Sequence, residues 1–173
     1  MTFKLKRIFL LAVVSTTLLT AISCGVYSFG GVTLDSRVET VQVDYFPNNA
    51  PLIEPILSQT FTLALQDKFI SQTNLDLVKS GGDIQFEGEI TGYRINPMTA
   101  TADQTAAQNR LTITVNVRYF NKYEEDKEFE RSFSHYFDYP ANAQLTGGVQ
   151  QAAFDDILER ITQDIFNASV AQW

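Results

Sequence analysis

The sequence predicts an α+β fold: a two-layer sandwich in which two helices cover one face of a mixed four-stranded sheet. Four segments alternate apolar and polar residues with a period of two, which is typical of half-buried strands. Two other segments repeat apolar residues at helical spacing. Proline, glycine and asparagine separate these segments, which follow one another in the order β-α-β-β-β-α.

The first strand and the first helix are predicted from a change of period. Residues 37–46 alternate as a strand does, and Pro47 ends the run. Residues 55–72 have helical spacing, and Pro55 suits a first helical turn because its missing N–H is no loss there. The apolar face of this helix consists of Leu57, Phe61, Ala64, Leu65 and Phe69.

Three later strands are predicted at residues 83–95, 110–120 and 127–139, and together they read as an antiparallel meander. Asn96 and Pro97 are expected to end the first of them. Residues 74–80, which precede the meander, are compatible with either a short strand or a turn. A second amphipathic helix is predicted at residues 148–170.

The two sheet faces are predicted to differ. Gly88 and Gly92 fall on the apolar side, where a helix can pack close to the sheet. Tyr93 and Phe120 are expected to project from the face that no helix covers, which is otherwise polar. This polar face is therefore free to meet a partner.

The N-terminal segment has the layout of a secretory signal peptide. Residues 1–23 carry three basic residues and no acidic one, and an apolar run ends at small residues. The run is short for a bilayer-spanning helix, which needs about 20 residues. We therefore expect residues 1–23 to be cleaved.

Cys24 is the only cysteine of the chain, so no internal disulfide can form. The sequence Ala21-Ile22-Ser23-Cys24 resembles a bacterial lipobox, which predicts a lipoprotein whose cysteine carries acyl chains such as palmitate. The alternative is an ordinary signal peptide followed by an unpaired cysteine. Residues 24–36 are interpreted as a lipidated tether, and residues 37–173 as a single domain.

Composition argues against several classes of function. The signal segment holds three of the 13 basic residues and none of the 20 acidic ones, so ten basic face 20 acidic residues after cleavage. Such a charge repels nucleic acid.

His135, the only histidine, is interpreted as a strand residue near an edge, and residues 124–126 as a solvated hairpin tip. No catalytic residue, metal site or cofactor is predicted, and an enzyme is not expected.

Two features suggest binding. The connection 97–109 is long for a hairpin, whose loops usually have two to five residues. Arg94 and Arg110 flank it and can converge on a phosphate or a carboxylate, for which the guanidinium has the matching fork geometry. The alternative is that these arginines are scattered and solvated.

The chain resembles the LptE family of lipopolysaccharide-assembly lipoproteins, in the form found in Bacteroidetes-type bacteria. The resemblance covers the chain after the signal segment. It rests on the lipobox and on four stretches, namely Gly25-Val-Tyr-Ser-Phe-Gly30, Val43-Asp-Tyr-Phe-Pro-Asn-Asn-Ala-Pro51, Ser58-Gln-Thr-Phe61 and Asn109-Arg-Leu-Thr-Ile113.

The resemblance implies an outer-membrane lipoprotein that plugs the LptD β-barrel, helps this barrel to assemble and assists insertion of lipopolysaccharide into the outer leaflet. Arg94 and Arg110 are then the candidates for lipopolysaccharide contact. Residues 25–31 lack acidic side chains, which implies an anchor on the periplasmic face.

Two rival functions make different structural predictions. A free-standing periplasmic lipoprotein that binds a ligand without a barrel partner requires a concave apolar pocket. An enzyme or inhibitor that acts on cell-wall polymers requires, for hydrolysis, two carboxylates facing each other across a cleft. Glu87 and Glu89 lie beside each other on one strand and imply no such cleft.

Overall fold

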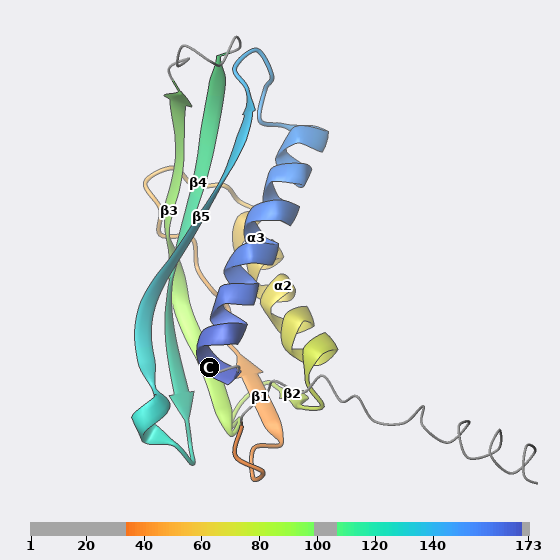
Figure 1. The fold of residues 1–173 in the computed structure, drawn as a ribbon, viewed down its shortest axis with the longest axis vertical. Coiled ribbons are helices and arrows are strands. Elements are labelled where there is room, and N and C mark those ends of the chain that lie inside the picture. The colour runs from red at the N-terminus through yellow and green to blue at the C-terminus, as the bar shows by residue number, and fades with distance from the viewer. Residues whose placement is uncertain (1–33, 99–106, 171–173) are drawn as a thin grey trace, which may run out of the picture. The chain divides into compact units, whose positions relative to one another are not determined.

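A computed structural model describes residues 34–98 and 107–170 of the chain. The signal segment, Cys24 and the tether up to residue 33 lie outside the described residues, so the predicted cleavage and acylation stay predictions. The described part contains a five-stranded mixed sheet, ordered β2-β1-β3-β4-β5, with both helices on one face (Figure 1). The two-layer α+β prediction is therefore confirmed in outline, with one strand more than predicted.

The elements begin and end close to their predicted positions. A single turn of 3₁₀ helix, η1, precedes the last strand. The bounds are β1 Thr40–Val43, α2 Leu57–Gln72, β2 Asp76–Val78, β3 Ile84–Met98, β4 Gln108–Asn121, η1 Glu125–Lys127, β5 Phe129–Pro140 and α3 Gly147–Val170.

The fifth strand is β2, which resolves the ambiguity at residues 74–80. It pairs in parallel with β1, and β1 pairs in parallel with β3 on its other side. The connection from β2 to β3 crosses close to β1, because a Cβ at Gly82 would lie 2.8 Å from the Cβ of Gln42. Three residues are too few to display an alternation, so only the pairing with β1 identifies β2 as a strand.

The meander formed by β3, β4 and β5 is antiparallel, as predicted. The expected end of β3 at Asn96 and Pro97 is wrong, since Pro97 lies opposite Asn109 and the strand continues to Met98. β1 does not pair with β3 there, and an edge position tolerates a proline that cannot donate a hydrogen bond. The connection to β4 is therefore shorter than the predicted loop 97–109.

A β-bulge between Ile90 and Gly92 changes which side chains of β3 face the helices. Tyr93 is 4% exposed, and its ring centroid lies 6.4 Å from that of Phe154 in α3. Its predicted projection from the uncovered face is therefore wrong. The predicted position of Gly92 is also wrong, because a Cβ there would meet Thr114 on the polar face. Phe120, which lies outside the bulged region, projects as predicted and is 38% exposed.

The core lies between the sheet and the helices (Figure 1). Phe69 of α2 packs between two rings, with its centroid 4.6 Å from that of Phe86 and 5.4 Å from that of Phe166. Four of the five residues predicted for the apolar face of this helix are fully buried, and Ala64 is partly buried. The helical period therefore identified the buried face of α2 correctly.

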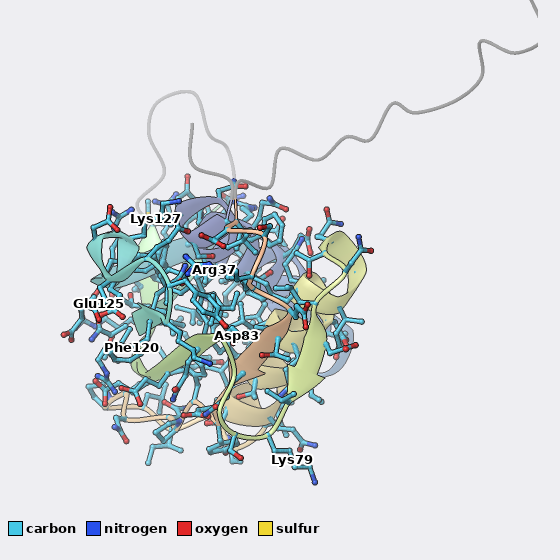
Figure 2. All side chains as sticks on the ribbon, turned by 90° about the horizontal axis from the view of Figure 1, so that it is seen from below. Arg37, Lys79, Asp83, Phe120, Glu125 and Lys127 are labelled. Atoms are coloured by element: carbon cyan, nitrogen blue, oxygen red, sulfur yellow. The ribbon has the colours of Figure 1, made fainter. Side chains whose placement is uncertain are left out.

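Asp83, just before β3, links several segments of the chain at the end of the domain shown in Figure 2. Its carboxylate accepts hydrogen bonds from the Thr40 hydroxyl at 2.8 Å, the Thr40 N–H at 3.2 Å and the Tyr123 hydroxyl at 3.2 Å. Lys122 Nζ lies 3.5 Å away. The hydrogen bond from the Thr40 hydroxyl is the main cause that lowers the pKa of Asp83 to about 2.

We expect Asp83→Asn to lower the free energy of unfolding by about 1.5–3 kcal/mol at pH 7, since several donors lose their charged acceptor. A lowered pKa in the folded state means that the stabilisation is present above the ordinary carboxyl pKa of 3.8. It is lost as the pH falls from 3.8 towards about 2. Urea unfolding at several pH values should therefore show the difference between wild type and variant shrinking in acid.

Asp67→Asn, which changes an exposed carboxylate in α2, is the control and should leave stability within about 0.5 kcal/mol of wild type. An effect of Asp83→Asn that stays constant down to pH 2 would contradict this role.

Candidate functional site

The sheet face turned away from the helices, called the open face below, is polar and internally hydrogen-bonded. Its side chains line up in rows across β3, β4 and β5 because the antiparallel register places them opposite one another. Three of these rows are Arg94–Thr112–Tyr136, Gly92–Thr114–Ser134 and Glu87–Arg118–Glu130.

Short contacts connect the middle of the open face. The Thr114 and Ser134 hydroxyls lie 2.9 Å apart, and Asn116 Nδ2 donates to Glu130 Oε1 at 2.8 Å. Arg118 Nε donates to Glu87 Oε1 at 2.9 Å. This face therefore offers a partner a polar surface whose side chains are already held in place by hydrogen bonds.

Arg110 is held by its own chain. Its Nε and Nη2 donate to the two carboxylate oxygens of Asp138 at 2.7 and 2.8 Å, and its guanidinium carbon lies 3.6 Å from the ring centroid of Tyr136. The hydrogen bond from Arg110 lowers the pKa of Asp138. The two guanidinium N–H donors that were expected to bind an anion therefore already bind a carboxylate of β5.

Arg94 lies on the same face as Arg110 and is exposed. The two are diagonal neighbours, since Arg94 pairs with Thr112 and Arg110 with Asn96. Within the described residues, Arg94 takes part in no ion pair. The structure therefore brings the two predicted arginines together but leaves only Arg94 uncommitted; their contact with lipopolysaccharide stays a prediction.

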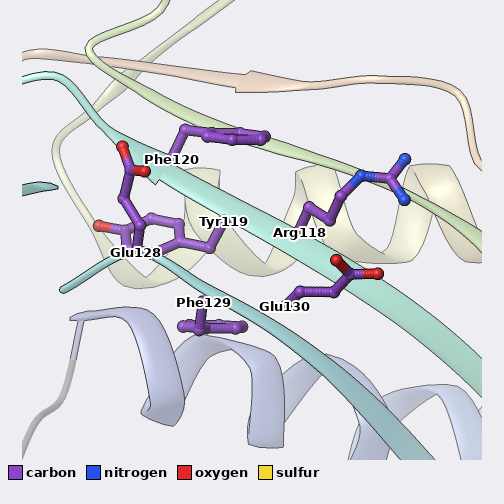
Figure 3. Close-up of a pocket in the computed structure, with 6 residues that line it drawn as sticks. All are labelled: Arg118, Tyr119, Phe120, Glu128, Phe129 and Glu130. Atoms are coloured by element: carbon purple, nitrogen blue, oxygen red, sulfur yellow. The ribbon is translucent and has the colours of Figure 1, made fainter. Parts of the chain in front are cut away.

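A shallow hollow of about 210 Å³ lies beside Phe120 (Figure 3). It is lined by Arg118, Tyr119, Phe120, Glu128, Phe129 and Glu130. No local sequence pattern predicts this hollow, although the predicted projection of Phe120 from the uncovered face indicates its position. The neighbouring carboxylates belong to β5 and the residue before it, which only the strand register brings next to β4.

The single histidine lies away from the open face. His135 sits on β5, the outermost strand on its side of the sheet, which confirms the predicted edge position. Its Nε2 lies 2.7 Å from Oδ2 of Asp164 in α3. This contact ties an edge strand to a helix.

Two absences concern residues 34–98 and 107–170, the ranges that the structure describes. No group of histidine, cysteine and carboxylate side chains in them has an arrangement that holds a metal ion. No helix in them combines the length and the apolar character needed to cross a membrane.

A sheet with one face sealed by two helices and the other lined with hydrogen-bonded polar groups defines a small α+β domain suited to contact with a partner. The chain belongs to the LptE family, described as lipopolysaccharide-assembly, whose model matches residues 38–169. The resemblance found in the sequence is thereby confirmed, and the family places the chain in lipopolysaccharide assembly. No curated protein matches the chain.

Solved structures that are similar to this chain have little sequence identity to it. The hypothetical protein CT253 from Chlamydia trachomatis is 10% identical, with a TM-score of 0.54, covering 78% of this chain and 99% of that one. A minor lipoprotein from Acinetobacter baumannii is 12% identical, with a TM-score of 0.43, covering 79% of this chain and 98% of that one. At such identities a likeness concerns the fold alone.

Proposed function

We propose that this protein is an outer-membrane lipoprotein, held on the periplasmic face through acylated Cys24, that plugs the LptD β-barrel and helps it to assemble. In this position it assists insertion of lipopolysaccharide into the outer leaflet. Membership of the LptE family supports the role in lipopolysaccharide assembly. The observation that carries the finer proposal is the polar open face.

The lumen of an outer-membrane barrel is polar and contains water. A plug therefore needs an outer surface that exchanges hydrogen bonds with water and with polar wall residues. The hydroxyl pair of Thr114 and Ser134 and the amide of Asn116 give the open face this character. The buried apolar side chains of the sheet lie under α2 and α3, so the open face can contact a polar wall while the core stays covered.

The hollow beside Phe120 gives no support to the alternative, a free-standing ligand-binding lipoprotein. Pockets for small ligands usually have volumes of about 300–1,000 Å³ and apolar walls. The hollow beside Phe120 measures about 210 Å³ and is bordered by Arg118, Glu128 and Glu130. Its size and its charged rim suit contact with a protein surface better than enclosure of a ligand.

Arg94 is the better candidate for lipopolysaccharide contact. The guanidinium of Arg110 is already bidentate to Asp138, so a phosphate would have to displace an intramolecular ion pair. Arg94 is exposed on the same face without such a partner among the described residues. A local cationic group of this kind is needed in a chain with a formal net charge of −7.

The decisive experiment is purification of the tagged full-length protein from detergent-solubilised outer membranes, followed by mass spectrometry. We expect a large β-barrel protein in near-stoichiometric amount and acyl chains on Cys24. Cys24→Ala should remove the acyl chains from the purified protein, because no other cysteine of the chain can carry them. Recovery of an acylated protein without a barrel would refute the plug while leaving the anchor intact.

A further inference from the structure

Arginine, an aromatic ring and a carboxylate occur together twice among the residues that the structure describes. Arg110 lies over Tyr136 and forks onto Asp138. Arg37 has its guanidinium carbon 4.5 Å from the ring centroid of Tyr123, and its Nε and Nη2 donate to Asp35 at 2.9 and 2.8 Å. In both places the flat face of the guanidinium stacks on the ring, and its N–H groups donate hydrogen bonds to the carboxylate.

The hollow beside Phe120 brings a ring and carboxylates together, but among the described residues no arginine lies over this ring. Phe120 is 38% exposed, and Glu128 and Glu130 border the same hollow (Figure 3). Among the described residues, neither carboxylate forms an ion pair and no cation lies over the Phe120 ring. Arg118 also borders the hollow, but its Nε is bound to Glu87 on β3.

The surroundings of the hollow favour a cation. The adjoining turn adds Glu125 and Asp126, which are exposed and form no ion pair within the described ranges. The lysines of this turn are already engaged, Lys122 with Asp83 and Lys127 with Glu124. Four carboxylates that form no ion pair among the described residues therefore lie in or next to the hollow, namely Glu125, Asp126, Glu128 and Glu130. Glu130 also interacts electrostatically with Arg118, which lies opposite it on β4.

We propose that the hollow binds an arginine side chain supplied by a segment of the barrel partner, an inference that rests on the proposed function. The guanidinium stacks on Phe120 and donates to Glu128 or Glu130. Arginine fits better than lysine because its planar group stacks and forks at the same time. A volume of about 210 Å³ suits one side chain rather than a larger ligand.

The first test places a photo-reactive benzoylphenylalanine at position 120 of the full-length protein in cells. After irradiation, we expect a crosslink to the barrel protein within a peptide that contains arginine next to the crosslinked residue. The same group at Leu63, an exposed position of α2, is the control and should give no crosslink to that peptide. A crosslink at position 120 to lipopolysaccharide, or to a peptide without arginine, would overturn the inference.

The second test uses two charge-matched double variants of the tagged protein. Glu128→Gln with Glu130→Gln removes the carboxylates of the hollow. The amide oxygen introduced at position 128 can still accept the hydrogen bond that the Asn121 N–H donates to Glu128 at 3.2 Å. We expect dissociation of the barrel to become about tenfold faster and less sensitive to salt. Glu125→Gln with Asp126→Asn makes the same charge change in the turn and should alter dissociation by less than about threefold.

These outcomes separate the two proposals. If wild type retains no barrel, the proposed function fails and the arginine site fails with it. If wild type and both double variants retain the barrel equally well, only the arginine site fails.

Discussion

Replacing Phe69 by alanine is expected to lower the free energy of unfolding by about 3–5 kcal/mol. The ring is fully buried and contacts Phe86 of β3 and Phe166 of α3, so a single side chain joins both helices to the sheet. Its removal loses buried apolar area and leaves a cavity that three secondary-structure elements cannot readily close. Urea unfolding, followed by circular dichroism, measures the loss.

Ile70→Ala provides the matched control, because Ile70 is the next residue of α2 and is 50% exposed. Its truncation should cost less than about 1 kcal/mol, since little buried area is lost. Equal losses of stability for the two variants would mean that α2 does not pack on the sheet through the face that carries Phe69.

Gly88→Ala is expected to cost about 3 kcal/mol or more. Gly88 has a φ of 155°, a conformation open essentially to glycine alone, which other residues adopt only with strain of about 1–3 kcal/mol. A Cβ there would also lie 2.0 Å from the backbone oxygen of Asn116 and 2.8 Å from the ring of Phe46. The oxygen belongs to the neighbouring strand, so relief of the clash disturbs the pairing of β3 with β4.

Gly148→Ala, at the start of α3, is the control for the glycine-to-alanine change. A Cβ at Gly148 meets nothing within 4 Å, and alanine is the better helix former. Stability should stay the same or rise by up to about 1 kcal/mol in the same unfolding experiment. A Gly88→Ala protein as stable as wild type would show that the backbone can leave this conformation without cost.

The contents of the candidate site could be predicted only in part. Arg94 and Arg110 were identified because they flank one loop, and the strand register does make them neighbours. Asp138, whose carboxylate binds the Arg110 guanidinium, lies 28 residues further along the chain, and no local pattern links the two. The arrangement at Phe120 escaped prediction for the same reason, since Glu128 and Glu130 reach it only through the pairing of β4 with β5.

Periodicity in the sequence by itself determined the type and order of the long elements. Side chains alternate across a strand and repeat every 3.6 residues around a helix, so burial of one face leaves a local record in the sequence. The buried residues Leu111, Ile113, Val115 and Val117 of β4 illustrate this record. The family resemblance likewise rested on short contiguous stretches, and it was confirmed.

Tertiary structure decided the features that depend on a distant partner. β2 is a strand only because β1 lies beside it. Pro97 remains in β3 because no neighbouring strand requires a hydrogen bond from the backbone N–H that proline lacks. The bulge near Thr91 turned Tyr93 towards α3, which a strict period of two could not predict. In each case, pairing between segments far apart in the chain outweighed the local pattern, because hydrogen bonds and side-chain contacts between strands determine the register.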